Sequence, residues 1–237
     1  YPGLASDAPD LFQKAKQAAF YAKQNGKNRI QVYEGNIDAE RRNKETGYEQ
    51  VAPTVYALVA AIDAKDSFTF QHSTNVSQYA VLLAQKLGLP GDDIHTVKVA
   101  GLLHDIGKIG IPESILKKAG KLTNEEYEIM KSHVQKSIEM IHYLPNMNYV
   151  IPAVVSHHER YDGKGYPRGL KGEGIPFLGR ILAVCDSFDA MISKRAYKEA
   201  LSVEYAMGEL EKNKGTQFDP KVADAFIELI KEGKVPL

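Results

Sequence analysis

One long loop restricts the possible folds of this chain more than any other feature. Residues 159–177 contain five glycines and two prolines, a composition that excludes a regular helix or strand. Loops of this length are uncommon in compact domains and are usually functional. On both sides of the loop, apolar residues recur at the three- and four-residue spacing of amphipathic helices. The chain is therefore predicted to be a helical bundle that one long loop interrupts.

Residues that start or stop helices set the expected helix bounds. Gly88 and Pro90 end one helix, and Thr123 with Glu126 forms a capping box that starts another near residue 125. Asp219 followed by Pro220 marks the start of the last helix. The remaining helices are expected over residues 73–87, 94–105, 149–158, 178–193 and 202–213, with the last over 219–231.

The N-terminal residues show a different pattern. Residues 1–34 predict a short helix that stops at Gly26 and a strand over 29–33. One helix and one strand cannot bury a core alone, so this piece is the remnant of an α/β domain. Residues 36–65 predict a further helix. The fold class is therefore all-α, a bundle preceded by that remnant. The apolar face of the helix at 36–65 would come from Val51, Val55, Leu58, Val59 and Ile62.

The composition excludes several classes of protein. The chain has 30 basic and 30 acidic residues, so binding to nucleic acid polymers is not expected, and an anionic ligand needs local positive charge. A single cysteine excludes an intrachain disulfide framework and agrees with a cytoplasmic location. No apolar run reaches the roughly 18–20 residues that span a bilayer. The chain begins at Tyr1 without Met, which suggests a fragment of a longer protein that could be membrane-attached.

Histidines and aspartates carry the predicted chemistry. Five of the seven histidines lie near a helix end or in an apolar helical frame. One such histidine is more often structural than a ligand, but five of them with two aspartates favour a metal centre. Neutral imidazole and carboxylate are typical ligands of iron, manganese and zinc. The candidate ligands are His72, His104, Asp105, His133, His157, His158 and Asp186.

The number of candidate ligands favours two ions. One octahedral ion has six positions and a catalytic ion must keep some open, so seven side chains are too many. Asp105 is the natural bridge between two ions, because its neighbour His104 can bind one of them. Two ions about 3.5–4 Å apart activate water and clamp a phosphate, as in phosphoester hydrolysis. Lys108 would neutralise phosphate charge there, so Asp105 and Lys108 are the predicted catalytic residues.

Four other residues near these motifs have simpler interpretations. His95 and His142 match no pattern and are expected at the surface or in packing. Cys185 is expected to be a small buried hydrophobic residue. Asp189 lies one turn after Asp186 and either supports a ligand or is an ordinary polar helix residue.

Several of these motifs together resemble the HD-GYP subgroup of the HD phosphohydrolase superfamily. They are residues 103–108, residues 157–167 and the single histidines His72 and His133. The resemblance covers about residues 66–226 and implies a bacterial phosphodiesterase that opens cyclic di-GMP to linear pGpG, with conversion to GMP left open. It implies two divalent ions, Fe or Mn. One would be held by His72, His104, Asp105 and Asp186, and the other by Asp105, His133, His157 and His158.

The resemblance also implies how substrate is held. Lys108 would contact the scissile phosphate, Tyr166 would line the ligand site, and Arg195 and Lys198 would grip the phosphates or guanine. Members with a third metal carry a glutamate four residues before the first histidine, where this chain has Phe68. A binuclear centre is therefore expected.

Residues 18–29 resemble the C-terminal end of a GGDEF domain. The signature loop of that domain is absent, so no cyclase chemistry is expected. The predicted domains are a GGDEF remnant over 1–35, a linker helix over 36–65 and an HD-GYP domain over 66–237. The linker helix would either pair with its copy in a homodimer or pack on the bundle, and the expected partners include a GGDEF domain.

Three alternative functions remain open. A hydrolase of other nucleotides would share His104 and Asp105 but has no reason to carry the Gly-Tyr-Pro loop. A phosphodiesterase for cyclic GMP-AMP would need no change in any motif. A non-catalytic receptor for cyclic dinucleotides would have no need of the complete ligand set.

Overall fold

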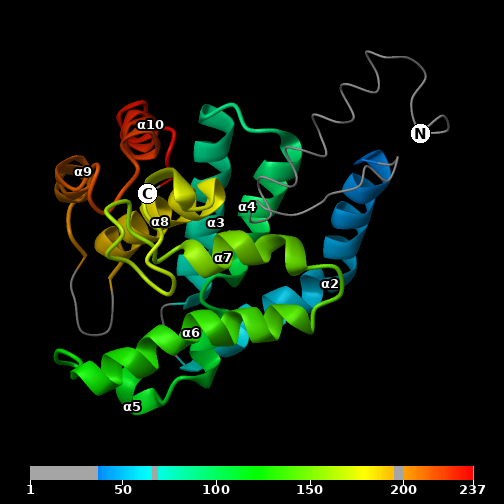
Figure 1. Cartoon of the computed structure of the whole chain (residues 1–237), viewed down its shortest axis with the longest axis horizontal. Coiled ribbons are helices and arrows are strands. Elements are labelled where there is room, and N and C mark those ends of the chain that lie inside the picture. Colours follow the sequence, from blue (N-terminus) through cyan, green and yellow to red (C-terminus); the bar gives the residue numbers. More distant parts are fainter. Residues whose placement is uncertain (1–36, 66–68, 195–199, 237) are drawn as a thin grey trace. The chain divides into compact units, whose positions relative to one another are not determined.

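The computed structural model describes residues 37–65, 69–194 and 200–236 (Figure 1). Contacts between Cα atoms divide the chain into two compact units, Tyr1–Glu45 and Thr46–Leu237. The helix and strand expected in residues 1–34 lie outside the described residues, as do Phe68, Arg195 and Lys198. The described helices belong to the second unit, except that α2 begins in the first.

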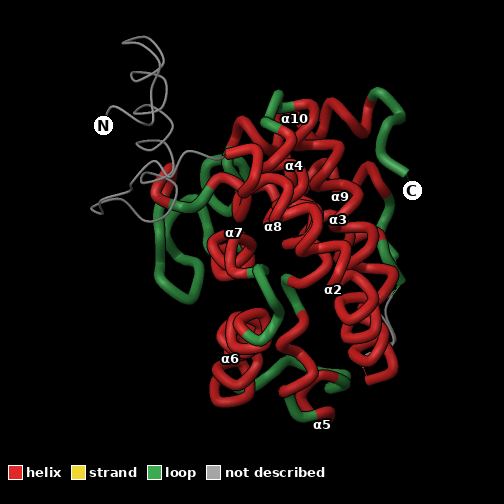
Figure 2. The backbone as a smooth tube through the Cα atoms, turned by 90° about the vertical axis from the view of Figure 1, so that its right-hand side faces the viewer, coloured by secondary structure: helices red, strands yellow, loops and turns green. Residues whose placement is uncertain are grey.

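The long helices agree with the predicted ranges to within a few residues, and the predicted all-α class is confirmed (Figure 2). The residues that the structure describes contain no β-strand, only an isolated bridge between Lys214 and Phe218. The long helices are α2 (Ile37–Lys65), α3 (Thr69–Lys86), α4 (Gly91–Leu103), α6 (Asn124–His142), α7 (Ile151–Ser156), α8 (Phe177–Ile192), α9 (Val203–Lys212) and α10 (Pro220–Lys231).

Four short elements were not predicted, because three to five residues are too few for a periodic pattern to register. They are η1 (Ile106–Gly110), α5 (Glu113–Leu116), η2 (Asn148–Val150) and η3 (Gly172–Gly174). The predicted helix over 149–158 is divided between η2 and α7.

Side-chain caps start three of the helices. The predicted capping box is present at α6, where Glu126 N–H donates to Thr123 Oγ1 and Thr123 N–H donates to the Glu126 carboxylate. Ser202 and Asp219 cap α9 and α10 in the same way, each accepting a backbone N–H of the first turn. The side chains that fix these helix starts are therefore readable from the sequence.

Helix α3 is central to the bundle and packs against α4, α8 and α10. The ring of Tyr79 on α3 meets Phe188 on α8 edge-on at 5.8 Å, and Phe188 meets Phe226 on α10 at 5.1 Å. All three side chains are buried. Within the described part of the chain, no helix is both long and apolar enough to cross a membrane.

The predicted apolar face of α2 is used within the bundle. Val51, Val55, Val59 and Ile62 are buried in the core, and Leu58 packs against it. The part of α2 that follows residue 45 is therefore held by the same core as α3 and α4.

Helices α3 and α4 approach closely at Gly101. A Cβ atom added at Gly101 would lie 2.7 Å from the Cα atom of Ser77, which no real packing allows. The hydroxyl of Ser77 donates to the backbone carbonyl of Lys98 at 2.7 Å. Only glycine permits this separation of the helices that carry His72 and His104.

Two glycines inside helices should therefore respond oppositely to alanine. We expect Gly101→Ala to lower the free energy of unfolding by about 1–3 kcal/mol, because the added methyl group overpacks the α3–α4 contact. Gly208→Ala on α9 should raise it by about 0.5–1 kcal/mol, because that site is open and alanine is the better helix former. Urea denaturation measures both. A Gly101→Ala variant as stable as the wild type would contradict the assigned contact.

Candidate metal centre

Five helices bring the predicted ligands to one place. Each ligand lies on a helix or directly after one. His72 is on α3, His104 and Asp105 follow α4, His133 is on α6, His157 and His158 follow α7, and Asp186 is on α8. Asp105 leaves the helical conformation, with φ −107° and ψ 6°, and the chain continues as η1.

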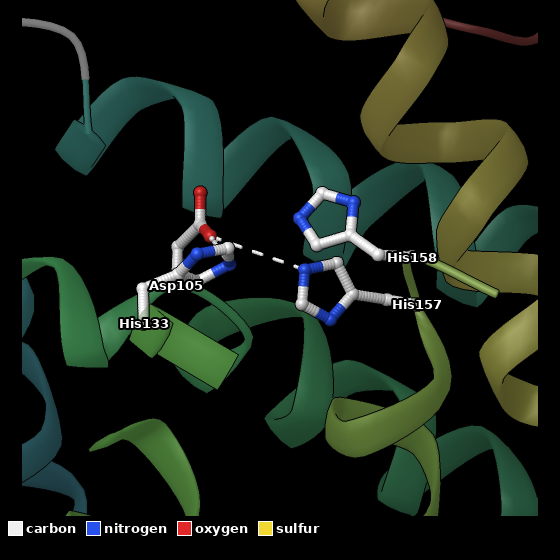
Figure 3. A group of neighbouring side chains, drawn as sticks. All are labelled: Asp105, His133, His157 and His158. Atoms are coloured by element: carbon white, nitrogen blue, oxygen red, sulfur yellow. Dashed lines mark ion pairs between the residues drawn. The ribbon is translucent and has the colours of Figure 1, made fainter. Parts of the chain in front are cut away.

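The seven candidate ligands form two adjoining groups. In each group, one ligand atom from every side chain lies within 4.8 Å of all the others. Five of the seven side chains are buried, and His158 and Asp186 are partly exposed. Figure 3 shows the first group gathered around Asp105. That group is Asp105, His133, His157 and His158, and the second group is His72, His104 and Asp186.

The two oxygens of Asp105 face different groups. Its Oδ1 lies 3.2 Å from Nε2 of His133 and 3.9 Å from Nε2 of His157 (Figure 3). Its Oδ2 lies 3.4 Å from Nε2 of His104, which belongs to the second group. Burial opposes ionisation of Asp105, but the Lys108 ammonium and the surrounding imidazoles hold the pKa of this carboxyl well below its ordinary value. The carboxylate is thus charged and placed between the groups.

Helix geometry sets the tautomer of three histidines. In His104, His133 and His157, Nδ1 lies 2.8, 2.7 and 2.6 Å from the backbone carbonyl oxygen three residues earlier. A carbonyl oxygen only accepts, so Nδ1 of each ring carries the proton. Each Nε2 therefore keeps a lone pair that points into the centre, which is the form that binds metals.

Four atoms at the centre are buried without a hydrogen bond. They are Nε2 of His104, His133 and His157 and Oδ1 of Asp105. An unsatisfied buried polar atom costs about 1–3 kcal/mol, and here these acceptors face one another. Divalent cations would satisfy all four at once. The donor set fits iron, manganese or a similar metal, so the cluster is able to hold metal ions.

Asp189 supports His72 from the side away from the centre. Nδ1 of His72 lies 2.7 Å from Oδ2 of Asp189, while Nε2 lies 3.1 Å from Oδ1 of Asp186. Asp189 also accepts hydrogen bonds from Asn75 and Ser193. Of the two interpretations of Asp189, the structure favours the supporting one. Burial lowers the pKa of His72, but hydrogen bonds to both carboxylates outweigh it and raise the pKa to about 9.

The rings of His158 and Tyr166 stack beside the first group. Their centroids are 4.7 Å apart with 25° between the planes. Burial is the main cause that lowers the pKa of His158 to about 4, so the ring is neutral at physiological pH. Burial also keeps the pKa of His157 well below its ordinary value. Tyr166 therefore covers a ligand that is already in its metal-binding form.

Lys108 reaches the centre from η1. Its Nζ lies 2.5 Å from Oδ2 of Asp105. The turn that places it is held on α6: Gly107 N–H donates to the hydroxyl of Ser137, and that hydroxyl donates to the His104 carbonyl. A Cβ atom at Gly107 would lie 2.0 Å from the carbonyl oxygen of His133. Ser137 is thus a positioning residue that the sequence gave no signal for.

Glu159 is a second positioning residue, and it anchors the loop. Its buried carboxylate accepts the backbone N–H groups of Arg168 and Leu170 at 2.8 and 2.9 Å. These bonds tie the far side of the Gly-Tyr-Pro turn to the residue directly after His158. The place of a charged residue there was the one signal available in the sequence.

The remaining residues singled out in the sequence lie away from the centre. His95 contacts the rings of Tyr48 and Tyr149, and His142 bonds to the Asn148 side chain, so both have packing or surface roles. Cys185 is fully buried, as predicted, and burial raises the pKa of its thiol.

The chain belongs to the HD domain family, whose pattern matches residues 57–222. Within that family it is of the HD-GYP type, because it carries both the His104-Asp105 pair and the Gly165-Tyr166-Pro167 turn. It is 41% identical over 181 residues to the cyclic di-GMP phosphodiesterase response regulator RpfG of Xanthomonas campestris, covering 76% of this chain and 48% of the relative.

Two further comparisons concern cyclic GMP-AMP. The chain is 39% identical over 208 residues to 3'3'-cGAMP-specific phosphodiesterase 2 of Vibrio cholerae, covering 84% of this chain and 39% of the relative. The chain thus spans about half or less of the length of these relatives. The crystal structure of a cyclic GMP-AMP specific phosphodiesterase from V. cholerae has the same fold, with a TM-score of 0.61, 19% identity, and 76% of this chain and 49% of that chain covered.

Loss of the Glu159 anchor should loosen the loop. We expect Glu159→Gln to raise amide hydrogen exchange at Arg168 and Leu170 by about tenfold, because one amide oxygen cannot replace a charged acceptor of two N–H groups. Exchange measured by mass spectrometry on peptides covering 160–171 checks this. The exposed Glu173 on the same loop provides the control Glu173→Gln, which should exchange like the wild type. Equal exchange in all three proteins would refute the anchoring role.

Metal ions should stabilise the folded protein. Saturation at a hundredfold excess over the dissociation constant stabilises by about 2.7 kcal/mol per site, so Mn(II) should raise the thermal midpoint by several degrees and chelator should reverse it. Asp105→Asn should lose most of this rise, whereas His142→Ala, which removes an exposed histidine outside the centre, should keep it. An undiminished rise in Asp105→Asn would place the ions elsewhere.

Proposed function

We propose that this chain hydrolyses cyclic di-GMP to linear pGpG in bacterial second-messenger signalling, using bound divalent metal ions. The observation that carries the proposal is the placement of Asp105 between two groups of inward-facing imidazoles. Membership of the HD domain family and the likeness to a cyclic di-GMP phosphodiesterase support it. Further conversion of pGpG to GMP is left to the product assay.

Two ions, Fe or Mn, would occupy the centre. His72, His104, Asp105 and Asp186 would hold one, and Asp105, His133, His157 and His158 would hold the other. When bound, the ions supply Lewis acidity to the phosphate and make a water molecule a better nucleophile. The buried acceptor atoms of His104, His133, His157 and Asp105 support this assignment.

The residues around the ligands would bind and orient the substrate. Lys108 is already in an ion pair with Asp105, and its partly exposed ammonium would turn to the scissile phosphate when the phosphate arrives. There it would offset the negative charge that develops as water attacks phosphorus and the 3′-oxygen leaves with a proton. Tyr166 would cover one side of the site. Arg195 and Lys198 are proposed to grip the phosphates or guanine, as expected from the sequence.

A second candidate substrate is cyclic GMP-AMP. The relative from V. cholerae that is 39% identical is named for this substrate. One purine in place of another changes neither the diester nor the metal centre, so the same residues would act on both. A non-catalytic receptor for cyclic dinucleotides is the remaining alternative.

The domain plan is also proposed: a GGDEF remnant over 1–35, a linker helix over 36–65 and a catalytic domain over 66–237. The resemblance of residues 18–29 to the end of a GGDEF domain supports the first part. A homodimer or a GGDEF domain would be the protein partner, and the cytoplasm the compartment. Size-exclusion chromatography with light scattering tests the dimer.

The first test is anaerobic incubation with cyclic di-GMP or cyclic GMP-AMP, with Mn(II), Fe(II) or chelator, and separation of the products. Metal-dependent pGpG supports the proposal, and the ratio of rates identifies the preferred dinucleotide. Bound but intact dinucleotide under every metal would favour the receptor.

Two substitutions separate the roles of neighbouring residues. Asp105→Ala should remove both metal and turnover, because the carboxylate faces both groups. Lys108→Met should keep its metal but lower kcat by about 10²-fold, because a preorganised charge next to the phosphate is lost. Lys117→Met is the matched control, since Lys117 is exposed and pairs with Glu113. Metal analysis with steady-state kinetics checks all three. Full turnover in Lys108→Met would exclude Lys108 from catalysis.

A further inference from the structure

An aromatic and cationic edge continues outward from the candidate metal centre. The ring of Tyr166 stacks on His158, and the ring of Tyr127 on α6 meets Tyr166 edge-on, 6.3 Å away at 80°. The Nζ atom of Lys131 lies 5.3 Å from the centroid of the Tyr127 ring and 5.8 Å from that of Tyr166. Rings and ammonium thus lead without interruption from a metal ligand to the surface.

Packing does not account for Tyr127. Its side chain is 46% exposed, so it contributes little to the core. Other large hydrophobic side chains are exposed among the described residues, including Tyr143 and Tyr205, but Tyr127 is the one in contact with Tyr166. An exposed aromatic ring beside a reactive centre is available to a ligand.

Stability does not account for Lys131 either. Its ion pair is with Glu128, whose side chain is 70% exposed, and such surface pairs stabilise a protein by little. Its contacts with two rings hold the ammonium on the side of α6 that faces Tyr166. Lys131 is therefore positioned by the aromatic rings rather than by a need of the fold.

The start of α6 is rigid, which fixes this edge relative to the centre. The capping box joins Thr123 and Glu126, and Lys118 pairs with Glu126 at 2.5 Å. Tyr127 follows directly, and His133 lies on the same helix. One helix therefore carries both a candidate ligand and the outer edge.

We propose that Tyr127 and Lys131 bind the purine nucleotide of the substrate that is not being attacked. The exposed face of Tyr127 packs on its base, and the Lys131 ammonium contacts its phosphate, which is the phosphate that stays intact. Every base has a face that stacks on an aromatic ring, and an ammonium neutralises a phosphate as a point charge. The inference rests on the proposed function and extends it to the second half of the dinucleotide.

The test compares two substrates in the metal-loaded protein. Cyclic di-GMP has a second nucleotide, whereas bis(p-nitrophenyl) phosphate has a diester and no nucleotide. For Tyr127→Ala and Lys131→Met, we expect KM for cyclic di-GMP to rise about tenfold while kcat changes less than about twofold, in line with the usual loss of one stacking or charge contact. The ratio of kcat/KM for the two substrates should fall by the same factor of about ten.

Three variants make the result specific. Tyr127→Phe and Lys131→Arg keep the ring and the charge and should restore KM to within about threefold of the wild type. Tyr143→Ala removes an 88% exposed tyrosine that follows the other end of α6 and should leave both substrates unaffected. An unchanged KM for cyclic di-GMP in both Tyr127→Ala and Lys131→Met would overturn the inference, as would an equal loss for both substrates.

Failure of the proposed function gives a different result. In that case, the wild-type protein with metal leaves cyclic di-GMP intact, whatever it does to bis(p-nitrophenyl) phosphate. Equilibrium binding of cyclic di-GMP then still tests the edge: weaker binding by Tyr127→Ala and Lys131→Met supports it, and unchanged binding overturns it.

Discussion

A buried carboxylate surrounded by imidazoles is the interaction on which the rest of the structure depends. Asp105 is 3% exposed and lies between two groups of histidine nitrogens that carry lone pairs. Such an arrangement repels itself unless positive charge is supplied, because acceptors face acceptors in a medium of low dielectric. The Lys108 ammonium supplies part of that charge in the structure described. The bundle therefore holds together, at its middle, a set of atoms that metal ions would stabilise.

The backbone prepares these atoms before any ion arrives. Three imidazoles donate Nδ1–H to a carbonyl within their own turn of helix, so no partner residue is needed to select the tautomer. His72 differs, because it relies on Asp189 from another helix. Ser137 and Glu159 then fix the η1 turn and the long loop to these helices. Local helix geometry sets most of the centre, and a few long-range bonds set the rest.

Much of this could be predicted from the sequence, for identifiable reasons. Long helices register as periodicity, and their starts register where a side chain caps them, as Thr123 and Asp219 do. The candidate ligands were found because histidines and aspartates are rare in apolar frames. Ser137 and Glu159 could not be found in this way, since their partners are backbone groups whose position depends on how the loop and η1 fold. For the same reason, the contact between Tyr127 and Tyr166 had no sequence signal.

The two groups of candidate ligands differ in how much of the chain each requires. The first group is complete in sequence at His158, whereas the second needs Asp186 on α8 and the support of Asp189. During synthesis from the N-terminus, the residues of the first group leave the ribosome before those of the second. The first group can therefore acquire an ion while α8 is still being made. The second group, which joins α3 to α8 across more than a hundred residues, closes only when the bundle does.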